Sequence, residues 1–138
     1  MKKAYTIFLI IILICIMTAC GNNHVTDGFI MLDTEKWPEN EYTTNIPKPE
    51  SKSTVRGWID PDKEYCHIEL PDMTQTESEK YIETLKAAGF VELEKVAEEI
   101  KNADYVSVGT LLTYDGITVS ISYLDEHFGM YIKKSDSN

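Results

Sequence analysis

Alternating apolar and polar residues predict a series of short strands between residues 55 and 132. The clearest run is residues 65–70, in which Cys66, Ile68 and Leu70 fall on one face and the intervening residues on the other. Two longer runs flank Asp115-Gly116, a dipeptide typical of two-residue hairpin turns. The predicted strands are residues 55–60, 65–70, 91–94, 105–114, 117–123 and 128–132. Because tight turns connect several of these strands, we expect an antiparallel sheet.

One segment has the periodicity of a helix. Thr74 and Glu77 form a capping-box pattern, in which each side chain accepts a hydrogen bond from the backbone of the other residue. An apolar stripe follows, and Gly89 then stands where a left-handed C-terminal cap belongs. The stripe consists of Tyr81, Ile82, Leu85 and Ala88. The helical spacing of Val96, Ile100 and Ala103 predicts a second, short helix.

These elements predict an α+β domain, an antiparallel sheet of about five strands with one main helix packed on one face. The domain is expected to span residues 36–134, followed by a disordered tail at residues 135–138. An antiparallel sheet commonly leaves its second face to solvent. Alternation predicts a candidate binding face made of Tyr65, His67, Ser120, Ser122, His127 and Tyr131. Aromatic rings and hydroxyls on a flat surface suit a protein or a glycan. The more common outcome for such a face is an ordinary solvated surface, here partly covered by residues 37–49.

The first residues are typical of a signal peptide. Lys2 and Lys3 form a basic head, an unbroken apolar run follows from Ile7 to Met17, and small residues precede Cys20. The run has 11 residues, whereas a helix needs about 20 to cross the hydrocarbon layer. We therefore predict a secretory signal peptide over residues 1–19 rather than a membrane-spanning helix.

The end of this signal, Met17-Thr18-Ala19-Cys20, resembles the lipobox of bacterial lipoproteins, with Met17 where leucine is usual. The resemblance implies that the Cys20 thiol receives a diacylglyceryl group and that Cys20 becomes the first residue of the mature protein. Two or more acyl chains, such as palmitate, anchor a protein stably. We expect a cell-membrane protein, lipid-anchored and facing outside the cytoplasm, with a flexible tether at residues 20–35. A secreted protein without lipid is the alternative.

The net charge limits which classes of partner the protein can bind, and the number of cysteines limits which disulfides it can form. The 119 residues from Cys20 onward carry all 23 acidic residues and 11 of the 13 basic ones, a formal net charge of −12. This charge disfavours nucleic acid and holds the domain away from anionic lipid. Only Cys66 remains after processing and lipidation, so the mature chain forms no internal disulfide. We expect Cys66 to be a small buried residue, with pairing to another chain as the alternative.

The stretch between Trp37 and Pro49 predicts an extended segment, because two prolines flank Lys48. We expect it to pack as a cover on the domain, and a docking peptide is the alternative. The chain resembles a family of small uncharacterised lipoproteins of Gram-positive anaerobes over most of residues 36–133. The resemblance rests on Trp37-Pro38-x-Asn40, Ile46-Pro47-x-Pro49, Ala88-Gly89-Phe90 and the Asp115-Gly116 hairpin. That family has no assigned activity, so the resemblance implies an anchor and a domain boundary but no mechanism.

Three patterns that suggest chemistry fail on spacing. Residues 60–64 carry carboxylates at alternate positions, but the sixth and twelfth positions lack the Gly and Glu of a calcium loop. Cys66 and His67 are neighbours on a strand and point to opposite faces, which argues against a thiol–imidazole pair. Residues 125–127 offer three metal-competent side chains in one turn without a distant fourth ligand. We expect no catalytic residue, no metal site and no cofactor.

The sequence therefore predicts a non-enzymatic binding or accessory protein at the cell envelope, with a protein or a wall glycan as partner and no nucleic acid. One alternative is a small envelope hydrolase or metal-dependent enzyme whose site the spacing does not reveal. Another is an inhibitor or immunity-type protein. A cleft gathering carboxylates or imidazoles from separate strands would favour the enzyme, and an uncovered aromatic and hydroxyl face would favour binding.

Overall fold

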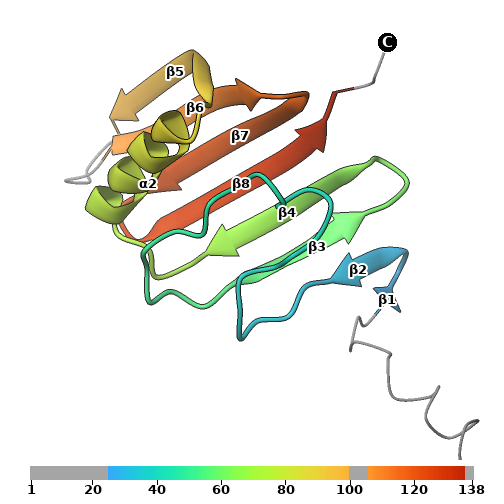
Figure 1. Cartoon of the computed structure of the whole chain (residues 1–138). Coiled ribbons are helices and arrows are strands. Elements are labelled where there is room, and N and C mark those ends of the chain that lie inside the picture. The colour runs from blue at the N-terminus through green and yellow to red at the C-terminus, as the bar shows by residue number, and fades with distance from the viewer. Residues whose placement is uncertain (1–24, 100–105, 136–138) are drawn as a thin grey trace, which may run out of the picture.

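The computed structural model describes residues 25–99 and 106–135. They form one antiparallel eight-stranded sheet with one α-helix on one face, an α+β architecture (Figure 1). The strands are β1 (Val25–Thr26), β2 (Phe29–Met31), β3 (Arg56–Asp60), β4 (Tyr65–Leu70), β5 (Val91–Glu99), β6 (Val106–Tyr114), β7 (Ile117–Leu124) and β8 (His127–Lys134). Their order in the sheet is β1-β2-β3-β4-β8-β7-β6-β5.

The sheet is larger than the sequence predicts, eight strands instead of about five. The two strands that match no predicted run, β1 and β2, lie within residues 20–35, the predicted tether. They pair as a hairpin, and β2 pairs with β3, so the sheet begins at Val25 rather than at residue 36. The hairpin turn holds Asp27 and Gly28 at positive φ, the conformation that two-residue hairpins require.

The predicted second helix is wrong where the structure describes it. Val96 lies in β5, which continues to Glu99 and pairs with β6 along its length. Ile100 and Ala103 lie outside the described residues. Helical spacing of a few apolar residues does not outweigh ladder hydrogen bonds to a neighbouring strand. The β6–β7 hairpin at Asp115-Gly116 is confirmed, with both turn residues at positive φ.

The helix α2 (Gln75–Ala87) is confirmed with both of its predicted ends. Thr74 is the N-cap of a complete capping box with Glu77. At the other end, the Phe90 N–H donates to the Leu85 carbonyl and Gly89 has φ 108°, the geometry of a Schellman ending. The helix buries Tyr81, Ile82 and Leu85 against the sheet.

Alternate residues of the four central strands build the core beneath α2. They are Cys66, Ile68, Leu70, Leu112, Val119, Ile121, Tyr123, Phe128, Met130 and Ile132, each at most 1% exposed. The backbones of β3 and β4 lie close together at Gly57, because a Cβ there would lie 2.1 Å from the His67 carbonyl oxygen. Only glycine therefore fits at that point of β3.

The segment from Trp37 to Pro49 covers the core beside α2, on the same side of the sheet (Figure 1). Tyr42 and Ile46 are each 4% exposed. The Tyr81 hydroxyl of α2 donates to the Pro47 carbonyl at 2.8 Å. The segment is thus a cover, as expected. It lies on the α2 side of the sheet and does not cover the opposite face.

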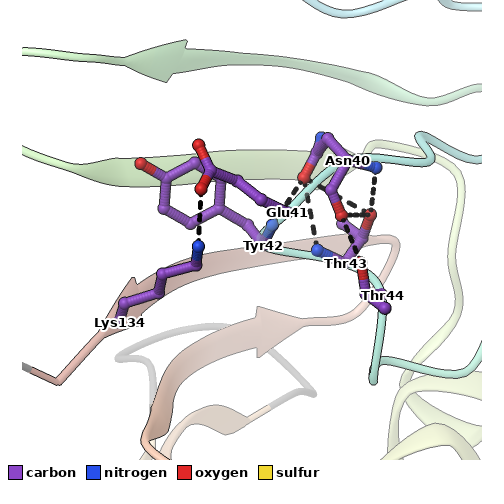
Figure 2. Close-up of polar contacts among 6 residues, drawn as sticks. All are labelled: Asn40, Glu41, Tyr42, Thr43, Thr44 and Lys134. Atoms are coloured by element: carbon purple, nitrogen blue, oxygen red, sulfur yellow. Dashed lines mark hydrogen bonds and ion pairs between the residues drawn. The ribbon is translucent and has the colours of Figure 1, made fainter. Parts of the chain in front are cut away.

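A polar turn at Asn40 holds the cover in shape. Figure 2 shows the Asn40 side-chain oxygen accepting from the backbone N–H groups of Tyr42 and Thr43. The Thr43 hydroxyl also donates to the Pro38 carbonyl at 2.7 Å. An ion pair between Glu41 and Lys134 then ties the turn to the end of β8. These hydrogen bonds make residues 40–46 a turn, so the middle of the segment is not extended as the sequence predicts.

Candidate binding surface on the open sheet face

The six residues of the candidate binding face all lie on the sheet face opposite α2. The β4–β8 register pairs Tyr65 with Lys133 and His67 with Tyr131. The β7–β8 register places Ser120 opposite Tyr131, Ser122 opposite Gly129, and His127 opposite Leu124. Each of these residues alternates with a residue of the buried core. We call this whole side of the sheet, opposite α2, the open face.

Five rings form a continuous row across one half of the open face. Trp58 lies 4.3 Å from His67 between ring centroids, and His67 lies 4.2 Å from Tyr131. Phe29 contacts the Trp58 ring edge-to-face at 6.3 Å, and Tyr65 lies 5.5 Å from Tyr131. The row crosses β2, β3, β4 and β8. The Phe29–Trp58 and Tyr65–Tyr131 distances are those of favourable aromatic pairs, and His67 lies closer still to its two neighbours.

His67 has a different role from the one predicted, because it is buried. It is 4% exposed and lies between Trp58 and Tyr131. Its Nε2 shares a hydrogen bond of 3.0 Å with the Glu69 carboxylate, whereas its Nδ1 has no partner among the described residues. Tyr131 remains 48% exposed at the end of this stack. His67 therefore supports Tyr131 and Trp58 and offers no contact area of its own.

Small residues leave a shallow depression in the other half of the open face, toward β5. Gly109 and Gly129 lie on either side of Ser122 in neighbouring strands. The depression has a volume of about 370 Å³. It is lined by Glu94, Val96, Gly109, Thr110, Leu111, Ser120, Ile121 and Ser122. Ser120 and Ser122 are exposed in it and offer hydroxyl groups beside the Tyr131 ring.

Sequence reasoning missed Trp58, Phe29, Leu111 and Gly109 of this surface. Alternation does place Trp58 of β3 and His67 of β4 each on one face of its own strand. The register that puts the two rings side by side depends on pairing between strands, which alternation does not encode. The sequence does offer one signal, which is that β2, β3, β4 and β8 each carry an aromatic ring on the face away from the core.

The other candidate chemical groups have structural roles. Cys66 is fully buried, and burial raises the pKa of its thiol to about 12, so it is not a nucleophile at neutral pH. The Asp60 carboxylate accepts from the backbone N–H groups of Asp62 and Lys63 and closes the β3–β4 turn. Among the described residues, no group of three or more His, Cys, Asp and Glu side chains could hold a metal ion.

Cys20 and the predicted signal peptide lie outside the described residues. No helix within the described residues is long and apolar enough to cross a membrane. No protein-family model matches the chain, and a search of curated proteins finds no match. The resemblance to small lipoproteins therefore stays a prediction.

Proposed function

We propose that this protein is a lipid-anchored binding protein at the outer face of the cytoplasmic membrane, and that it binds a protein partner through the open face. The anchor is supported by the basic head, the 11-residue apolar run and Met17-Thr18-Ala19-Cys20. The binding role is supported chiefly by one observation. Tyr131 is half exposed on a face that the Trp37–Pro49 cover does not occupy.

Exposed apolar side chains on this face favour a protein over a glycan. By register, Met31, Val91 and Val96 share the face of Tyr131, and they are 38%, 60% and 48% exposed. Aliphatic side chains cannot form hydrogen bonds with sugar hydroxyls, but protein interfaces bury such side chains together with tyrosine. Val96 and Leu111 also line the depression beside Tyr131, so the apolar groups adjoin the aromatic row.

The anchor is tested by acyl labelling of cells that express the full chain. We expect the wild-type protein to incorporate labelled palmitate and the Cys20→Ala variant to incorporate none. Labelling of both forms, or of neither, would contradict a lipid on Cys20.

The binding face is tested by crosslinking membranes of the source cell and purifying the protein with its adducts. The Tyr131→Ala variant is expected to lose the protein adduct by about tenfold, because truncating a central interface tyrosine costs roughly 1–2 kcal/mol or more. The purified partner should then bind this variant more weakly by a similar factor.

Thr84→Ala is the matched control, because Thr84 is an exposed position on α2, across the sheet from the open face. Its adduct should equal that of the wild type. Equal recovery by the Tyr131→Ala variant, or an adduct made of glycan without protein, would reject the proposed partner class.

A further inference from the structure

The strand β5 ends the sheet and is exposed along its whole length. All nine of its residues, Val91–Glu99, are exposed. Its only partner among the described strands is β6. An edge strand presents a row of unpaired N–H and C=O groups on its outer side. This row is a template for one more antiparallel strand.

The two edges of the sheet differ in how they are protected. At the other edge, β1 has two residues, which is too short to receive a partner strand of any length. The nine residues of β5 include no proline, and Val91, Leu93 and Val96 are 60%, 59% and 48% exposed. One irregularity in register lies between Glu92 and Glu94, and the ladder is regular from Glu94 to Glu99. The regular part is long enough to pair with a peptide.

The negative charge of β5 indicates which residue types an added strand would carry. The strand carries four glutamates and one lysine, a formal charge of −3. By register with Leu111 and Ser107, Glu94 and Glu98 lie on the open-face side with Val96 between them. An added strand would place every second side chain opposite this acidic, apolar, acidic series. Basic residues flanking one apolar residue at alternate positions would complement it.

The same charge disfavours a second copy of this chain, because two strands of charge −3 would repel each other on pairing. The added side chains would also meet the depression, since Glu94 and Val96 form part of its lining. A strand on β5 is therefore continuous with the open face.

We infer that β5 is a strand-addition site for a basic, extended segment of a protein partner. This inference deepens the proposed protein-binding function and rests on it. The partner segment would pair its backbone with the outer side of β5. Its basic side chains would face Glu94 and Glu98, and an apolar side chain would lie beside Val96.

The test uses the full chain purified in nonionic detergent and a synthetic nine-residue peptide with lysine, valine and lysine at alternate positions between threonines. Binding is followed by fluorescence anisotropy. Two isomers of the peptide are N-methylated on odd or on even residues, which removes the N–H donors from one edge or the other. Strand addition predicts that one isomer binds about tenfold more weakly, while the other keeps its affinity within about threefold. Equal binding of both isomers would show attraction by charge alone and would overturn the inference.

Hydrogen exchange locates the bound peptide. The amides of Val91–Glu99 are expected to exchange more slowly when the lysine peptide is present. Slowing confined to other strands would overturn the inference. So would slowing of β5 that depends on protein concentration without peptide, because that result would show pairing between two copies.

A charge reversal provides the second line of test. The double variant Glu94→Lys with Glu98→Lys is expected to lose the lysine peptide by about tenfold and to gain a matched peptide with glutamate in place of lysine. Unchanged preference in a folded double variant would overturn the role of charge. Tyr131 takes no part in these assays, so a failure at β5 is distinguishable from a failure of the Tyr131 surface.

Discussion

Replacement of His67 by alanine should destabilise the domain without removing any surface that a partner could reach. His67 is 4% exposed and contacts the rings of Trp58 and Tyr131. Each ring pair contributes about 0.5–1.5 kcal/mol, and the hydrogen bond to Glu69 contributes about 1 kcal/mol. The unpartnered Nδ1 costs about 1–3 kcal/mol, which the alanine variant regains.

The remaining contribution is the space that the imidazole leaves, and a cavity in a packed row adds roughly 1–2 kcal/mol. Together these effects predict that His67→Ala lowers the free energy of unfolding by about 2–3 kcal/mol. The variant His67→Phe keeps both ring contacts, loses the Glu69 bond and removes the unpartnered nitrogen. Its stability is expected to stay within about 1 kcal/mol of the wild type.

The assay is urea unfolding followed by tryptophan fluorescence. With a slope of about 1.5 kcal/mol per M, the urea midpoint of His67→Ala should fall by roughly 1.3–2 M. An alanine variant as stable as the wild type would refute the stacking role of His67. A phenylalanine variant as unstable as the alanine variant would refute the energetic argument, because it would give the Glu69 hydrogen bond the dominant share.

Three further predictions concern the core residue Cys66, the helix cap and the contact between α2 and β5. Because the pKa of the Cys66 thiol is raised to about 12, a thiol reagent at pH 8 should label Cys66 only after unfolding, and rapid labelling of the folded protein would contradict its burial. Thr74→Ala should lower the free energy of unfolding by about 1 kcal/mol through loss of the helix cap, and an unchanged urea midpoint would contradict this. Lys86 lowers the pKa of Glu92, and the same contact raises the pKa of Lys86. The stability lost in Glu92→Gln should therefore be constant between about pH 5 and pH 10. It should shrink below about pH 4 as the carboxylate protonates, and above about pH 10.5 as the amine deprotonates. A pH-independent difference would contradict this pair.

The sequence predicts local elements well where one residue type has one physical solution. Thr74 and Glu77 cap a helix because their side chains satisfy free backbone N–H groups, and Asp115-Gly116 turns a hairpin because both residues tolerate positive φ. The two faces of β4 also follow from alternation, since Cys66 belongs to the core and His67 to the open face.

The features that the sequence does not predict depend on pairing between distant parts of the chain. The β1–β2 hairpin lies in the region predicted to be a tether. So short a hairpin gains stability only when β2 pairs with β3, a contact that the local sequence does not reveal. The burial of His67 depends on rings from β3 and β8 that meet only in the folded sheet. The same holds for the depression, whose lining residues come from β5, β6 and β7. Strand register, which sets these contacts, is a property of the whole sheet.

The most direct test of the binding face is photo-crosslinking in living source cells, with a photoreactive residue placed at position 131, 122 or 84 of the full chain. We predict a protein adduct of one size from positions 131 and 122 and none from position 84, which lies on α2. Adducts of equal yield from all three positions, or none from positions 131 and 122, would contradict the assignment of the open face as the binding surface.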